Sequence, residues 1–236
     1  MRCYLSELRP SGISEAVVDV AGPVSGGFVQ MTNRDWSIST KTLSDMLDGA
    51  PVRLINDMTA LGHAVPGLAG PADEDRQSLV VNIGTGFNVC PVIEAAGKVV
   101  CPPSQMGHVH LSQSLTSALT DRFGDQVADF TFIEDCFSGR GYAHLRALWP
   151  GPGFPEFYAS LIRILALDLI VACMPLSGIW FCGGVARTVL ATPAGQGLCK
   201  GLPAPVPLPP DLVIPVQIIA DDFAALRGCA AMPFQG

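Results

Sequence analysis

The sequence predicts an α/β fold, and three of its features carry this prediction. Nearly half of the 236 residues are apolar (49%) and only 15% are charged, so the chain can bury a substantial core. Short apolar runs that end at glycine or proline are typical of buried strands, and VVDVA at 17–21, before Gly22-Pro23, is one of them. Segments with apolar residues on one helical face lie between such runs. Strands that alternate with helices indicate α/β architecture.

The N-terminal part contains a predicted hairpin and a strand–helix pair. Gly26-Gly27 predicts a hairpin turn between the strand at 17–21 and a second strand at 28–31. Further along, we expect a helix at 40–47, a strand at 52–55 and a helix at 58–65 that ends before Pro66-Gly67. The polar segment Gly70–Gln77 has no periodicity, so it is the candidate linker to a second domain at 70–221.

The second part repeats the alternation of strands and helices. Strands at 79–83 and 89–93 flank Gly84-Thr85-Gly86 and should form a hairpin-like unit. His108 and His110 lie on an alternating stretch, where a strand would place both on one side. The last expected elements are a long helix at 157–174, a strand at 178–182, a strand at 212–219 and a closing helix at 222–231.

Charge and composition exclude several classes of protein. The net charge of −7 and the pI near 4.9 argue against a nucleic-acid partner, because phosphate backbones are bound by clustered Lys and Arg. A nucleotide remains compatible, since backbone N–H groups and Mg²⁺ can hold its phosphates. The apolar stretch at 157–174 carries Arg163 and Asp168, so a core helix is expected there and no membrane partner. Eight cysteines without a C-x-x-C pair, and a start without a signal peptide, favour a reduced, cytoplasmic protein.

Asn56-Asp57 directly follows an apolar strand and precedes a helix. One interpretation is a helix cap, in which Asp57 accepts N–H bonds from the first turn. The other is a carboxylate at the carboxyl end of a strand, where α/β folds place their ligand sites. A carboxylate there could remove a proton from a sugar hydroxyl.

Two glycine-rich segments and two histidines also admit both structural and functional interpretations. Gly84-Thr85-Gly86 is either a tight turn or a loop that approaches phosphate oxygens, and the chain has no Walker-type P-loop. Gly183-Gly184 either ends a buried strand or gives an adenine ring flat access to the backbone. His108 and His110 have no further ligand at metal spacing, which favours a hydrogen-bonding role over a metal site.

Taken in order, these segments resemble the bacterial glucokinase family of the actin-like sugar kinases. The resemblance preserves order and rough spacing over nearly the whole chain. Its motifs are Ala21-Gly22-Pro23-Val24, Met31-Thr32-Asn33 with Trp36, Leu54-Ile55-Asn56-Asp57 with Thr59-Ala60, Gly84-Thr85-Gly86, Gly107-His108-Val109, Glu134 with Ser138-Gly139 and Gly141, Gly183-Gly184 with Arg187, and Asp222 with Leu226 and Gly228.

The resemblance implies an ATP-dependent hexose kinase and a role for each matching residue. Asp57 would be the base that accepts the proton of the 6-hydroxyl of glucose or a similar hexose. Sugar hydroxyls would be bound by Asn56, His108 and Glu134, with Gln105 beside them. Gly84, Thr85 and Gly86 would face the phosphates of ATP, and Gly183 with Gly184 would border the adenosine. Mg²⁺ would arrive with ATP, because phosphoryl transfer needs a metal to offset charge on the phosphate oxygens.

The resemblance also implies a two-lobed, actin-like (ribonuclease H-like) fold. The small lobe would comprise 1–69 with 222–236, the large lobe 70–221, and the sugar and nucleotide would lie in the cleft between them. The family opens with an Asp-x-Gly-Gly-Thr phosphate loop that this sequence does not contain, so we expect the first strands and the loop of the N-terminal lobe to be missing. Their absence would leave the strand at 17–21 with an open edge that favours a homodimer.

Three departures from the family pattern leave a second hypothesis open. The phosphate loop is missing, Gln105 stands where the family has a glutamate, and the stretch 142–178 is shorter than its counterpart. Losing preorganised phosphate donors is the costliest of the three, since one such donor is commonly worth about 10²–10³ in rate. The alternative to a hexose kinase is therefore a catalytically impaired, glucokinase-like protein that binds sugar or acts in assembly.

Overall fold

The computed structural model describes residues 12–30, 37–70 and 74–233. Cys3 and the motif Met31-Thr32-Asn33 with Trp36 lie outside these residues. The chain divides into two compact units, Met1–Ala64 with Asp222–Gly236, and Val65–Asp221. The division falls inside a helix, α3 (Asp57–Ala69), whereas the boundary expected from the polar segment lay after residue 69.

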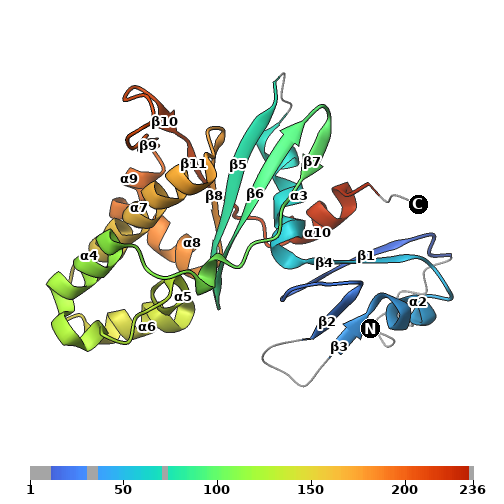
Figure 1. Ribbon diagram of the computed structural model, residues 1–236, viewed down its shortest axis with the longest axis horizontal. Coiled ribbons are helices and arrows are strands. Elements are labelled where there is room, and N and C mark those ends of the chain that lie inside the picture. Colours follow the sequence, from blue (N-terminus) through green and yellow to red (C-terminus); the bar gives the residue numbers. More distant parts are fainter. Residues whose placement is uncertain (1–11, 31–36, 71–73, 234–236) are drawn as a thin grey trace. The chain divides into compact units, whose positions relative to one another are not determined.

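The larger unit is built on a five-stranded mixed sheet in the order β11-β8-β5-β6-β7 (Figure 1). β5 runs parallel to β8, and β8 runs parallel to β11. β5 and β6 form an antiparallel hairpin closed by Gly84, Thr85 and Gly86, as the sequence predicts, and β7 extends it. The strands are β5 (Arg76–Ile83), β6 (Phe87–Ala95), β7 (Lys98–Val100), β8 (Gly178–Cys182) and β11 (Val216–Ile218).

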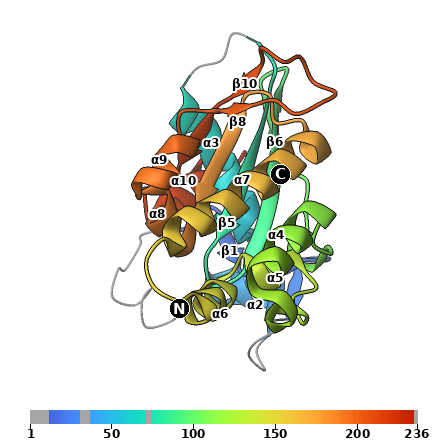
Figure 2. The ribbon, with the colours of Figure 1, turned by 90° about the vertical axis from the view of Figure 1, so that its left-hand side faces the viewer.

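Helices cover one side of this sheet, with α7 (Phe154–Cys173) at their centre (Figures 1 and 2). Tyr158, Leu161 and Ile162 of α7 are fully buried, so the predicted core helix is confirmed. No helix among the described residues has both the length and the apolar character that crossing a bilayer requires. The other helical segments are η1 (Met106–His108), α4 (Gln113–Phe123), η2 (Gly124–Val127), α5 (Ile133–Cys136), α6 (Gly139–Leu148), α8 (Gly184–Leu190) and α9 (Pro193–Leu198).

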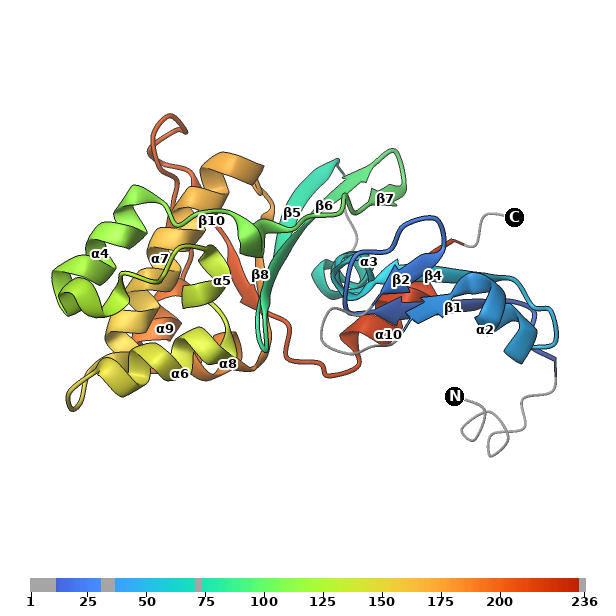
Figure 3. The ribbon, with the colours of Figure 1, turned by 60° about the horizontal axis from the view of Figure 1, so that its bottom comes forward.

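The smaller unit pairs β1 (Ala16–Val20) with β4 (Val52–Asn56) in parallel. Val20 and Leu54 pack with Leu43 of α2 (Thr40–Met46), whereas Ile55 packs with Cys229 of α10 (Ala224–Ala231). Figure 3 shows α2 and α10 beside this strand pair. A second pair, β2 (Phe28–Gln30) with β3 (Ser37–Ser39), is antiparallel.

Two predicted strand arrangements were wrong. Gly26 and Gly27 do form a tight turn, with φ of 57° and 71°, but it joins Ser25 to Phe28 by two backbone hydrogen bonds. In the described part of the chain β1 pairs with β4 and β2 with β3, so the turn does not join β1 to β2. The single strand expected at 212–219 is divided by Pro215 into β10 (Val213–Ile214), which pairs with β9 (Leu202–Pro203), and β11.

Two further expectations need correction. α3 begins at Asp57 and continues through Pro66 to Ala69, because tertiary packing outweighs the preference of proline for a helix end. His108 ends the short helix η1 and His110 forms an isolated bridge with Phe132, so the two histidines do not share a strand. The geometric reason for pairing them as metal ligands is therefore removed.

Candidate functional site

The smaller unit carries Asn56 and Asp57 at the carboxyl end of β4. The side-chain oxygens of both residues accept a hydrogen bond from the backbone N–H of Met58, at 3.0 Å from Asn56 and 2.9 Å from Asp57. Asn56 also donates its amide to the carbonyl of Gly22 at 2.9 Å, which ties the Gly22-Pro23 segment to the start of α3. Asn56 is the residue before the helix, so it takes the capping role that one interpretation gave to Asp57.

The environment of Asp57 raises the pKa of its carboxyl group. Burial is the main cause, because it removes water from the charged form, and the neighbouring carboxyl of Asp19 on β1 adds to it through charge repulsion. The hydrogen bond from Met58 acts in the opposite direction and is outweighed. A carboxylate with a raised pKa accepts a proton more readily, which suits a general base.

The larger unit gathers most of the predicted site residues around the β5–β6 loop. Gly84 donates its N–H to the carbonyl of Gly86 at 3.0 Å and accepts the N–H of Gly139, at the start of α6, at 2.6 Å. Ser138 caps α6 by accepting the N–H of Gly141 at 3.1 Å. Thr85 is exposed at the tip of the loop. The hydrogen bond from Gly139 therefore ties the loop to the start of α6, while Thr85 is exposed to solvent.

Glu134 on α5 lies against this loop and against η1. Its Oε2 accepts the N–H of Phe87 at 3.1 Å. Cβ atoms added at Gly86 or Gly107 would lie 3.1 Å and 3.2 Å from the same oxygen, so both positions leave space that the carboxylate occupies. Among the described residues, Oε1 of Glu134 has no hydrogen-bond partner, and the side chain is half-buried. This oxygen can accept a hydrogen bond from a ligand hydroxyl.

Gln105, the residue before η1, and His108, the last residue of η1, flank the same cluster. His108 donates its backbone N–H to the carbonyl of Gln105 at 3.2 Å, and both side chains are exposed. Sequence reasoning missed the residue that holds this turn, Asn88 of β6. The Asn88 amide donates to the carbonyl of Ser104 at 2.8 Å, and its oxygen accepts the N–H of Met106 at 3.1 Å. An asparagine inside a strand, two residues after a glycine loop, was the available signal.

The structure requires glycine at position 183 but not at position 184. Gly183 has φ of 90°, and a Cβ there would collide with the carbonyl of Ile83, so this glycine lets β8 and β5 approach closely. A Cβ at Gly184 would meet nothing within 4 Å, so the backbone there is open. Cα of Gly183 also lies 3.6 Å from the position of a Cβ on Gly84, so the β8–α8 turn lies next to the Gly84-Thr85-Gly86 loop.

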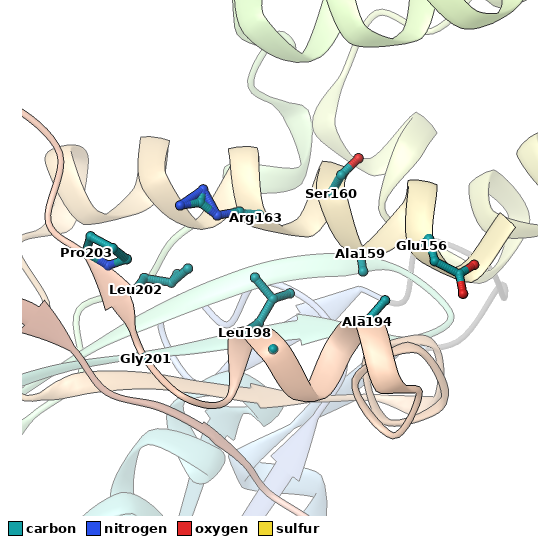
Figure 4. A pocket seen from close by; sticks show the side chains of 10 residues that line it. Glu156, Ala159, Ser160, Arg163, Ala194, Leu198, Gly201, Leu202 and Pro203 are labelled. Carbon is teal, nitrogen blue, oxygen red and sulfur yellow. The ribbon is translucent and has the colours of Figure 1, made fainter. Parts of the chain in front are cut away.

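A pocket of about 430 Å³ lies elsewhere in the larger unit, between α7 and α9 (Figure 4). Ala159, Leu198 and Leu202 line it, with Glu156 and Arg163 as charged members, and none of the predicted site residues does. The described residues contain no group of three His, Cys, Asp or Glu side chains that could hold a metal ion.

Comparison with solved structures identifies the class of fold. A glucokinase from an Antarctic psychrotroph has a TM-score of 0.71 at 22% identity, covering 98% of this chain and 83% of that one. A glucokinase from Balamuthia mandrillaris in complex with glucose has a TM-score of 0.63 at 15% identity, with coverage of 97% and 80%. The fold is that of the actin-like sugar kinases, as the sequence predicts.

The chain belongs to the glucokinase family, because the family model described as "Glucokinase" matches residues 1–149. The glucokinase of Ralstonia nicotianae is 29% identical over 177 residues, which cover 68% of this chain and 48% of that protein. The glucokinase of Erwinia tasmaniensis is 32% identical over 173 residues, with coverage of 69% and 50%. The chain thus spans about half the length of these curated relatives.

Proposed function

We propose that the chain acts in transferring a phosphoryl group from ATP to the 6-hydroxyl of glucose or a similar hexose, in the cytoplasm. The observation that carries the proposal is the cluster of Glu134, Gly86 and Gly107, in which a half-buried carboxylate keeps one oxygen for a ligand. Membership of the glucokinase family supports it. Glu134, with Gln105 and His108 at the two ends of η1, would bind sugar hydroxyls.

Asp57 would act as the general base on the sugar hydroxyl. Its raised pKa places the carboxylate closer to the range in which it can take up a proton as the hydroxyl oxygen attacks. Asn56 holds Asp57 at the first position of α3 through the shared N–H of Met58. The second proton of the Asn56 amide can still donate to a hydroxyl, because an amide carries two and only one is used for Gly22.

The β5–β6 loop has groups that fit a nucleotide phosphate. The N–H of Gly84 and that of Gly139 are used within the protein, so the hydroxyl of the exposed Thr85 and the N–H groups of Thr85 and Gly86 are the groups proposed for phosphate oxygens. The open backbone at Gly184 fits a flat ring, whereas Gly183 is explained by packing. When bound, ATP with Mg²⁺ supplies the phosphoryl group and the charge that offsets its oxygens.

Glucose binding by variants of Glu134 tests this proposal. A hydrogen bond to a charged group contributes about 1.5–3 kcal/mol, so Glu134→Ala should raise the Kd for glucose about tenfold to hundredfold. Glu134→Gln should cost less, since it keeps an acceptor. Isothermal calorimetry measures both, with Glu156→Gln in α7 as the control for loss of one exposed carboxylate. Equal glucose affinity in wild type and Glu134→Ala, with both folded, would remove the sugar site.

A further inference from the structure

Two cysteines lie close together where β6 and the end of β7 meet in the larger sheet. Cys90 is in β6, and Cys101 directly follows the last residue of β7. The antiparallel ladder pairs Ile93 with Val100, so its next step places Cys101 opposite Val92. Val92 and Cys90 point to the same face, because side chains alternate along a strand. Cys90 and Cys101 are therefore diagonal neighbours, for which Cα atoms are typically about 7–8 Å apart.

The two thiols are in contact. A hydrogen bond between the side chains of Cys90 and Cys101, together with burial, holds the pKa of Cys90 well above its usual range. Cys90 is only 1% exposed, whereas Cys101 is half-buried and can meet a reagent from solvent. None of the cysteines in the described residues is in a disulfide.

We propose that Cys90 and Cys101 are a redox modification site that forms a reversible disulfide. A disulfide needs Cα atoms about 4.4–6.8 Å apart, so the backbone at Cys101 has to approach β6 by about 1–2 Å. The chain after Cys101 permits this movement, because Cys101 lies beyond the paired residues of β7. Pro102 and Pro103 follow it and have no N–H with which to continue the ladder.

The oxidant is a small disulfide such as oxidised glutathione. The thiolate of Cys101 attacks one of its sulfurs, which forms a mixed disulfide and releases one glutathione thiolate. Cys90 then attacks Sγ of Cys101 while its proton passes to the departing glutathione sulfur, which releases the second glutathione as a thiol. Two protein thiols are oxidised and one glutathione disulfide is reduced to two thiols. Excess reduced thiol reverses both steps.

The disulfide would act on the turn that carries Gln105 and His108, and this part rests on the proposed function. The segment between Cys101 and η1 runs along β6, where Asn88 holds Ser104 and Met106 with bonds of 2.8 Å and 3.1 Å. Drawing Cys101 toward Cys90 displaces this segment against the Asn88 contacts. Oxidation should therefore weaken glucose binding about fivefold, the effect of losing one neutral hydrogen bond.

Peptide mapping tests the disulfide itself. Trypsin cleaves after Arg76, Lys98 and Arg122, which separates Cys90 on peptide 77–98 from Cys101 on peptide 99–122. After oxidation with glutathione disulfide and blocking of remaining thiols, the two peptides should appear joined without reductant and separate with it. Cys101→Ser should abolish the joined species, and Cys199→Ser, which removes another half-buried cysteine, should not. Both peptides blocked, or a stable glutathione adduct on Cys101, would overturn the assignment.

Calorimetry with glucose tests the consequence. The oxidised wild type should bind about fivefold more weakly than the reduced protein, while Cys101→Ser should bind equally under both conditions. Joined peptides with unchanged glucose affinity would refute the effect on the turn. If the reduced wild type does not bind glucose, the proposed function fails, and the peptide map still decides whether the disulfide forms.

Discussion

Asp57→Asn tests the proposed catalytic role of Asp57 apart from helix capping, because Asn56 also caps α3. Asparagine keeps an oxygen that can accept the N–H of Met58, and Asn56 accepts the same N–H at 3.0 Å. The start of α3 is therefore retained. Asparagine cannot accept the hydroxyl proton, and general-base catalysis is typically worth about 10²–10⁴ in rate. The kcat for glucose phosphorylation should fall by about that factor, with little change in KM.

Although kcat should fall, the stability of Asp57→Asn at neutral pH should rise. The raised pKa of Asp57 means that folding disfavours its charged form, so the stability it contributes below its ordinary pKa of 3.8 is lost as pH rises through the folded value. Removing the charge also forfeits a favourable interaction with the helix dipole, of about 0.3–1 kcal/mol. The direction of the pKa shift shows that burial and Asp19 outweigh the favourable terms. Asp57→Asn should thus match wild type near pH 3.5 and melt higher at pH 7.

Two measurements on a form of the protein that phosphorylates glucose check this prediction. A coupled assay gives kcat and KM, and melting curves between pH 3.5 and 7 give Tm. Asp48→Asn is the matched control, since Asp48 is exposed and its φ of 55° suits asparagine equally well. Unchanged kcat would leave Asp57 without a catalytic role. A Tm that falls equally at all pH values would show that Asp57 acts as a structural residue.

The remaining predictions concern the turn that carries Gln105 and His108, the contact between α10 and α3, and the catalytic rate of the chain. Gln105→Glu introduces the carboxylate of the family pattern at an exposed position and should lower the Kd for glucose about fivefold to tenfold by calorimetry, whereas Gln217→Glu, also exposed, should not change it. Asn88→Ala removes the bonds to Ser104 and Met106 and should raise KM more than it lowers kcat; equal losses in both would contradict a role in sugar positioning. Gly228→Ala should destabilise the protein by about 1–3 kcal/mol in chemical denaturation, because its Cβ would collide with the carbonyl of Ala60, while Gly197→Ala meets nothing and should be neutral or stabilising. The 236-residue chain alone contains no Asp-x-Gly-Gly-Thr motif, so its kcat should lie far below the usual range of about 1–100 s⁻¹ for kinases, and an ordinary value would show that the loop is replaced.

Local patterns determined the elements whose signals lie in a few adjacent residues. The apolar runs predicted β8 at its observed bounds and β5 and β6 around the Gly84 loop, since a buried strand has to be apolar on both faces. The order of short motifs was sufficient to predict the glucokinase family, and the match of the glucokinase family model to residues 1–149 confirms it. The glycine loops at 84–86 and 183–184 could be located for the same reason, because each directly follows an apolar strand, whereas Gln105, His108 and Glu134 were named from the family resemblance.

Only the tertiary structure decided contacts between residues far apart in sequence. It paired β1 with β4, a choice that depends on which strands can be buried together and that the turn at Gly26-Gly27 does not encode. It placed the Glu134 carboxylate against Phe87, explained Gly183 by the carbonyl of Ile83 and gave the capping of α3 to Asn56. It also brought Asn88 to the turn before η1 and Cys90 to Cys101. A single sequence carries no signal for such pairs, because the energy of each contact depends on a partner that folding alone brings within reach.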